Sequence, residues 1–222
     1  MIKKQDILEA YNFRHACKIF DKDKKISEED FDFLLETARL SPSSFGMEPW
    51  RYLVITNQEL KEKIKPSCWN QDQIDTCSHL VVILADTKAV QDEEYIKKMF
   101  SRRGLNEDDT KNYVQKFKEY LKDKMMNFVT RYFYKKFTED RAIYEWCSRQ
   151  TYIAAANMTT SAAMIGIDSC FIEGFEKEKV EETLELDTSK EELALILTFG
   201  YRVNGQKPKY RLNIDEIVTK ID

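Results

Sequence analysis

Four short segments of this 222-residue chain hold residue types that could bind or transform a small molecule. Two are basic and lie near opposite ends, Arg14-His-Ala-Cys-Lys18 and Pro208-Lys-Tyr-Arg211. Guanidinium and ammonium groups bind anions, phosphates above all. Each segment alone also has an ordinary interpretation, because charged pairs and tails usually serve solubility. The other two segments, a serine-rich loop from Ser41 to Trp50 and a strand end from Phe171 to Gly174, can likewise be helix caps and turns.

Several familiar sites are missing from the sequence. The six glycines form neither G-x-G-x-x-G nor G-x-x-x-x-G-K-[ST], so we expect no Rossmann or P-loop nucleotide site. The two histidines, His15 and His79, are far apart, and the five cysteines are scattered without a C-x-x-C pair, so we expect no metal. Cys17 lies two residues from His15 and could be a nucleophile, but a free cysteine is more often a small buried hydrophobic residue.

Composition narrows the class of protein. Basic and acidic residues number 35 and 39 and are mixed along the chain, so no broad positive field exists to attract nucleic acid. The start is charged where a signal peptide would be apolar, and the longest apolar run, 80–85, is too short to cross a bilayer. The odd number of cysteines fits reduced thiols, which are typical of a reducing compartment. We therefore expect a cytoplasmic protein that contacts no membrane.

The elements that must position the four segments follow from periodicity and capping signals. Apolar runs rich in β-branched residues predict strands at 52–56, 80–85, 167–172 and 193–199. Helices are expected at 4–13, 27–39, 57–65, 150–165 and 176–186, the fourth buried on all sides and ended by Gly166. A charged, aromatic stretch at about 91–137 indicates a helical excursion. We predict one α+β domain over 1–222, with a polar tail from about 207.

Together the four segments resemble the FMN-dependent NAD(P)H nitroreductases of bacterial type, in order and spacing from Arg14 to Arg211. The resemblance implies a central, mostly antiparallel sheet surrounded by helices, in an intertwined homodimer. Two FMN molecules would lie at the subunit interface, and the chain ends would reach across to the partner. It also implies an oxidoreductase that passes hydride from NAD(P)H to a small-molecule electron acceptor.

The resemblance gives the basic residues a role in holding FMN. Arg14, Lys209 and Arg211 would bind the phosphate, with His15 and Ala16 alongside. This agrees with the chemistry of a dianion, which needs several fixed cationic donors.

The flavin ring would contact residues from three of the four segments and from one more. Lys18 would lie near N1 and the C2 carbonyl, where an ammonium group supports the negative charge of reduced flavin. No side chain would be catalytic, because the flavin does the chemistry. The remaining expected contacts are Pro42, Ser43 and Ser44 along the flavin, Asn70 and Gln73 at the pyrimidine edge, and Phe171, Ile172, Glu173 and Gly174 beneath the ring. A backbone N–H of this last segment would meet N5.

Aromatic residues of the excursion fall where the family covers the flavin and selects substrates. Most of these rings are expected in the core, with Phe128, Tyr132 and Phe133 as candidates for lining a substrate pocket. Four residues depart from the family pattern. Gly46 and Glu48 replace common amides, Gln73 replaces a frequent basic residue and Phe171 a frequent proline.

Three functions remain open at this point. The first is a ping-pong oxidoreductase that reduces a nitroaromatic, a quinone or a similar electrophile. The second, motivated by Gln73 and Phe171, is a flavin-binding or sensing protein with only slow NADPH oxidase activity. The third is an interaction protein whose charged excursion docks a partner. The sequence does not identify the physiological oxidant, choose between NADH and NADPH, or tell whether oxygen reacts with the reduced flavin.

Overall fold

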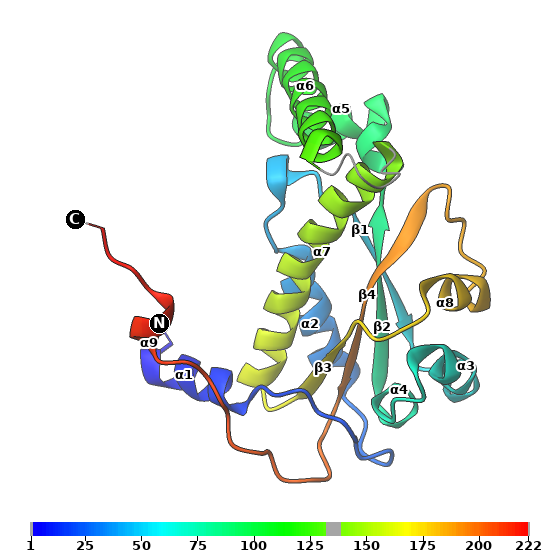
Figure 1. Ribbon diagram of the computed structural model, residues 1–222, viewed down its shortest axis with the longest axis vertical. Coiled ribbons are helices and arrows are strands. Elements are labelled where there is room, and N and C mark those ends of the chain that lie inside the picture. The colour runs from blue at the N-terminus through cyan, green and yellow to red at the C-terminus, as the bar shows by residue number, and fades with distance from the viewer. Residues whose placement is uncertain (1, 132–138, 222) are drawn as a thin grey trace.

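The computed structural model describes residues 2–131 and 139–221, and its centre is an antiparallel sheet (Figure 1). The strands are β1 (Trp50–Ile55), β2 (His79–Asp86), β3 (Asp168–Ile172) and β4 (Glu191–Gly200), in the order β1-β2-β4-β3. All three pairings are antiparallel, with a bulge between Ile83 and Leu84. The predicted α+β class, its four strands and the antiparallel arrangement are confirmed.

Both faces of the sheet are covered, which explains the near-continuous apolar runs of its central strands. Successive residues of β2 alternate between two hydrophobic clusters: Val81 and Ile83 belong to one, and Leu80 and Val82 to the other. Helices α2 (Glu28–Arg39) and α7 (Glu139–Met164) cover the first face. Helices α3 (Gln58–Ile64), α4 (Gln73–Thr76) and α8 (Lys177–Thr183) lie on the opposite side of the sheet (Figure 1).

Local sequence signals explain where several helices begin and end. The Ser27 hydroxyl accepts a hydrogen bond from the Asp30 N–H at 3.1 Å and caps α2. Asn57 does the same for α3, accepting from the Leu60 N–H at 2.9 Å. Gly166, with φ +78°, follows the end of α7. Helix α8 is shorter than the predicted 176–186 because the chain turns at its end, where Glu185 has φ +52°.

Helix α7 differs from its prediction in two ways. It begins at Glu139, well before residue 150, and it is not buried on all sides. Ile153 and Met164 are 40% and 43% exposed in the single chain, and Ala156 is exposed as well. The physical reason is that α7 packs against α1 (Lys4–Phe13), α2, α6 (Glu107–Arg131) and the sheet, and none of the described residues covers one apolar strip of the helix.

The predicted excursion contains α5 (Glu93–Ser101) and α6 (Glu107–Arg131). Phe117 is fully buried at their junction, where its ring packs against those of Phe45, Phe100 and Trp146. Among the side chains described in this region, Phe100 and Phe117 are buried, Tyr95 and Tyr120 pack against the core, and Tyr113 is 39% exposed. The residues predicted to line a substrate pocket lie outside the described residues, which include neither Tyr132 and Phe133 nor the Phe128 side chain.

The two ends of the chain run side by side (Figure 1). Helix α1 (Lys4–Phe13) packs against α7 and leads into an extended segment. After β4 the chain returns past this segment and ends in the short helix α9 (Ile214–Ile217). The tail exposes a series of apolar side chains, Leu212, Ile214, Ile217, Val218 and Ile221. None of the helices within the described ranges is long and apolar enough to span a membrane.

Candidate functional site

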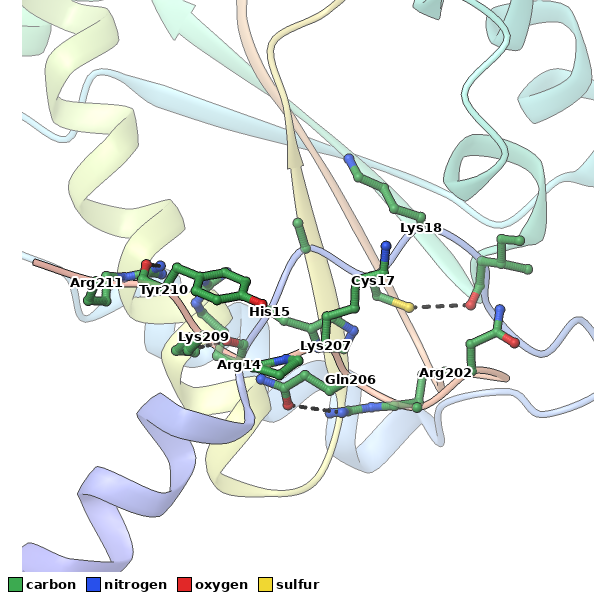
Figure 2. Close-up of a pocket in the computed structure, with 15 residues that line it drawn as sticks. Arg14, His15, Cys17, Lys18, Arg202, Gln206, Lys207, Lys209, Tyr210 and Arg211 are labelled. Atoms are coloured by element: carbon green, nitrogen blue, oxygen red, sulfur yellow. Dashed lines mark hydrogen bonds between the residues drawn. The ribbon is translucent and has the colours of Figure 1, made fainter.

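A pocket of about 550 Å³ lies between the segment 14–19 and the tail 202–211 (Figure 2). The described residues that line it include six basic ones and no acidic one: Arg14, Lys18, Arg202, Lys207, Lys209 and Arg211. Six of the residues predicted to bind the cofactor lie here together, namely Arg14, His15, Ala16, Lys18, Lys209 and Arg211. Both ends of the chain thus form one strongly positive site.

Backbone carbonyls of the N-terminal segment hold the tail in place. The Lys209 ammonium donates to the Tyr11 carbonyl at 2.5 Å and to that of Arg14, and Gln206 donates to the Asn12 carbonyl at 2.8 Å. Burial, followed by the nearby cations Arg14 and Arg211, lowers the pKa of Lys209. An anion in the pocket would relieve this repulsion between cations.

Beneath the pocket lies an ion pair that the sequence did not indicate. The Arg202 guanidinium forms an ion pair with Asp168, a carboxylate only 3% exposed, at 2.6 Å, and the Arg202 backbone N–H donates a hydrogen bond to the second carboxylate oxygen at 2.9 Å. Arg202 also donates to the carbonyl of Phe13 at 3.3 Å and to Gln206 at 3.1 Å. It therefore connects β3, the N-terminal segment and the tail.

His15 lies 3.6 Å from the same carboxylate, measured from Nδ1 to the Asp168 Oδ1 atom. Burial, and then the positive charge of Arg202, lower the pKa of this histidine, although Asp168 opposes the shift. The imidazole is therefore mainly neutral at pH 7, and the guanidinium and ammonium groups supply the charge of the pocket.

The segment 14–18 docks along β3 as a short parallel bridge between Ala16 and Ser169. This places Lys18 beside β3, where its ammonium lies 3.7 Å from the Cys170 sulfur. Burial raises the pKa of Cys17 to about 11, and burial also raises the pKa of Cys170. Both thiols are therefore protonated at neutral pH, which argues against Cys17 as a nucleophile.

The end of β3 meets a tight turn between α3 and α4. Trp69 and Asn70 both adopt left-handed backbone conformations, with φ 55° and 53°, and both are exposed. The Gln71 side chain donates to the Gly174 carbonyl at 2.8 Å and accepts from Gln73 at 2.8 Å. Gln73 is only 2% exposed, so it has little surface for direct contact with a cofactor.

Glu173, next to this turn, is exposed and accepts a hydrogen bond from the Tyr152 hydroxyl of α7 at 2.9 Å. Ile172 is buried in the cluster around α3 and α8, and Phe171 packs on the opposite cluster. The sequence offered no signal for Gln71, Tyr152 or Arg202, because each acts through a neighbour that is distant in the chain.

The serine-rich loop lies apart from the pocket within one chain (Figure 1). Pro42 is exposed, the Ser43 hydroxyl accepts from the Glu48 N–H at 2.9 Å, and the Ser44 N–H donates to Gln150 of α7 at 2.9 Å. A site that combines this loop with the basic pocket would need a second copy of the chain.

Gly46 and Glu48, the two residues of this loop that depart from the family pattern, face the end of helix α5. Glu48 pairs with Arg102 at 2.8 Å, and Gly46, at φ +58°, leaves room for Arg103, whose guanidinium would lie 3.1 Å from an added Cβ. Glu48 therefore pairs with one arginine of the helical excursion, and Gly46 leaves space for the next one.

Comparisons with known proteins agree with this architecture. The model of the nitroreductase family matches residues 11–201. A Staphylococcus haemolyticus protein, provisionally named as an NAD(P)H nitroreductase, is 44% identical over 219 residues, which cover 96% of each chain.

Two solved structures are similar in fold. A nitroreductase-like protein from Streptococcus mutans has a TM-score of 0.85 at 19% identity, covering 99% of this chain and 100% of the other. A provisional nitroreductase from Exiguobacterium sibiricum, solved in complex with FMN, has a TM-score of 0.76 at 25% identity, covering 100% and 98%. The family model and the close relative together establish that this chain belongs to the nitroreductase family.

Proposed function

We propose that this protein is an FMN-dependent oxidoreductase that passes hydride from NAD(P)H to a nitroaromatic, a quinone or a similar electrophile. The observation that carries the proposal is the pocket of six basic residues contributed by both ends of one chain. Family membership and the FMN complex of the Exiguobacterium relative support the choice of cofactor.

The pocket fits the phosphate of FMN. Within the described residues, Arg14, Lys209 and Arg211 form no ion pair with a carboxylate, so their charges remain available to an anion. A phosphate dianion accepts several charge-assisted hydrogen bonds from such groups. We assign Arg14, Lys209 and Arg211 to the phosphate, with His15 and Ala16 at its side.

The turn at the end of β3 fits the flavin ring. Lys18 lies between the pocket and β3, where its ammonium would support negative charge on the ring. Gly174 donates no hydrogen bond from its backbone N–H among the described residues, so this N–H can serve a ligand. We assign the exposed Asn70 amide to the pyrimidine edge, and Ile172 and Glu173 to the strand end beneath the ring.

When bound, FMN supplies the group that takes a hydride from NAD(P)H and gives it to the electron acceptor, so both substrates use one site in turn by a ping-pong mechanism. The chain contributes binding and electrostatics. Its cations hold the phosphate and offset the charge of the reduced ring, and its protonated thiols stay out of the reaction.

We further propose that the functional unit is a cytoplasmic homodimer built from a single domain over residues 1–222. The apolar strip of α7 and the apolar tail are exposed in one chain, and both would be buried against a second copy. The same arrangement would bring Pro42, Ser43 and Ser44 of one chain to the pocket of the other.

An absorption spectrum before and after FMN addition, together with a melting curve, tests the proposal. We expect the purified protein to gain bound-flavin absorption and a higher melting temperature, because a cofactor that binds only the folded state stabilises it. Protein that binds no FMN and shows no stabilisation would refute the function.

Two sets of variants sharpen this test. Arg14→Met with Arg211→Met should weaken FMN binding by at least about tenfold, since hydrogen bonds to charged groups contribute about 1.5–3 kcal/mol each. Arg39→Met, which removes an exposed arginine paired with Glu36, should not change it. Truncation before Pro208 should abolish FMN binding and reduce dimerisation, as measured by light scattering.

Stopped-flow bleaching of the bound flavin by NADPH separates an enzyme from a flavin-binding protein. The replacement of a basic residue by the buried, neutral Gln73 motivates this comparison. Rapid bleaching, followed by reoxidation with a nitroaromatic or a quinone, supports the oxidoreductase. Slow bleaching by both NADH and NADPH would leave a flavin-binding or sensing protein.

A further inference from the structure

Gln71 is fixed by three hydrogen bonds at the end of β3. Its amide nitrogen donates to the Gly174 carbonyl at 2.8 Å and to the Cys68 carbonyl at 3.1 Å, and its amide oxygen accepts from Gln73 at 2.8 Å. Both donors and one acceptor site of the amide are therefore used by protein groups. The side chain has one orientation that satisfies all three partners.

The Gly174 backbone is held from two further directions. The Phe175 N–H donates to the Glu173 carbonyl at 3.1 Å, which closes a tight turn around Gly174. The Trp69 ring lies against the glycine so closely that an added Cβ would be 2.7 Å from two ring carbons. The carbonyls on both sides of the Gly174 N–H are thus fixed, while this N–H itself has no acceptor among the described residues.

Gln73 completes the arrangement from the buried side. Its amide donates to Gln71 and lies 3.9 Å from the Cys170 sulfur. A neutral amide at position 73 therefore acts on the strand end through Gln71, without placing a charge there. This gives a structural reason for the departure from the basic residue that is frequent at this position in the family.

We propose that Gln71 is a positioning residue that holds the Gly174 N–H ready to donate a hydrogen bond to the flavin N5. This inference rests on the proposed function, because it needs bound FMN. A fixed N–H donor stabilises oxidised flavin, because its N5 accepts a hydrogen bond. The same donor destabilises reduced flavin, because its N5 carries a hydrogen and the two donors face each other. Loosening Gly174 should therefore favour the reduced form.

Gln71→Glu is the direct test, because it keeps the size and the acceptor oxygen but removes both donors. Loss of one hydrogen bond of ordinary strength corresponds to about a fivefold to tenfold change in an equilibrium constant. We expect the reduction equilibrium of bound FMN to shift by up to that factor toward the reduced form, and a tenfold shift is about 30 mV for a two-electron couple. The added negative charge by itself would favour the oxidised form, so the direction of the shift identifies the lost hydrogen bond. The midpoint potential is measured by spectroelectrochemistry.

Gln58→Glu is the matched control. It adds the same charge and removes a donor to a backbone carbonyl, that of Asp75 at 3.0 Å, on the outer side of α4. Its midpoint potential should equal that of the unaltered protein. Gln73→Leu, which removes the donor to Gln71 and the weak contact with the Cys170 sulfur, should give a shift in the same direction as Gln71→Glu but smaller.

A second readout does not depend on FMN. Amide hydrogen exchange of the apo-protein, followed by NMR, should show faster exchange at Gly174 and Phe175 in Gln71→Glu, with the β2 and β4 amides unchanged. If Gln71→Glu does not fold, Gln71→Leu takes its place in both measurements.

The outcomes separate the two proposals. If the unaltered protein binds no FMN, the proposed function fails. If it binds FMN but the Gln71 and Gln73 variants keep its midpoint potential, the role of Gln71 is refuted and the function stands. An equal shift in Gln58→Glu would also refute it, because the effect would then not depend on the hydrogen bond to Gly174.

Discussion

Replacing Arg202 with methionine should loosen the basic pocket from beneath. The guanidinium is held between the Asp168 carboxylate at 2.6 Å, the Phe13 carbonyl at 3.3 Å and Gln206 at 3.1 Å. Methionine keeps much of the side-chain volume and removes the ion pair and both hydrogen bonds of the guanidinium. The substitution therefore separates the charge of Arg202 from its packing.

The magnitude follows from the burial of the carboxylate. Breaking a buried pair by removing one partner costs about 3–5 kcal/mol, because an uncompensated charge remains. Asp168 is 3% exposed, but it would keep the Arg202 backbone N–H at 2.9 Å, and the Arg202 side chain is itself partly exposed. We therefore expect the free energy of unfolding to fall by about 2–3 kcal/mol.

Urea unfolding of the apo-protein at pH 7 and constant protein concentration measures this change. Arg39→Met is the control, since its pair with Glu36 is exposed and should contribute little to stability. Arg202→Lys should recover part of the loss. Asp168→Asn combined with Arg202→Met should cost less than the sum of the single changes. If Arg202→Met is no more destabilising than Arg39→Met, the bridging role of this ion pair is wrong.

Three further predictions concern stability. Burial, with nearby lysines, lowers the pKa of His79 to about 4. Because the unfolded chain then binds one more proton than the folded protein below pH 6.5, the free energy of unfolding should fall by about 2–3 kcal/mol from pH 6.5 to 4. His79→Phe should flatten this part of the pH profile, as measured by urea titrations. Gly200→Ala should cost about 1–3 kcal/mol, because the new Cβ would lie 2.7 Å from the Phe20 ring, and a melting temperature equal to that of the unaltered protein would contradict the contact. The exposed Glu48–Arg102 pair should give a coupling energy below about 1 kcal/mol in a double-mutant cycle, and a larger value would show that it is more strongly coupled than its exposure suggests.

Much of the fold could be predicted because its signals are local. Ser27 and Asn57 cap their helices with their own side chains, and the apolar run of β2 reflects burial on both faces. The end of α8 was harder to place, since it depends on a non-glycine residue, Glu185, with a positive φ. Burial around α7 was overestimated, because the absence of charged residues in a helix does not show which of its faces pack against the rest of the chain.

The candidate site also combines features that the sequence indicates with features that only the fold sets. The resemblance to the family selected Arg14, Lys209 and Arg211, and their residue types agree with it, since a phosphate needs cations wherever the fold places them. Their positions in one pocket depend on contacts between residues almost two hundred positions apart, such as the Lys209 ammonium on the Arg14 carbonyl. No local pattern encodes such a contact.

The sequence by itself therefore determined the strands, most helix ends and the chemical character of the site, because periodicity, capping and charge are properties of neighbouring residues. Only the tertiary structure decided which groups act together. Asp168 and Arg202 are joined because β3 and β4 are antiparallel neighbours, so residues at the start of one strand and just past the end of the other meet. Gln71 reaches Gly174 because it directly follows the left-handed turn at Trp69 and Asn70, which lies at the end of β3. Hydrogen bonds form between groups that are close in space, and distance along the chain does not predict that proximity.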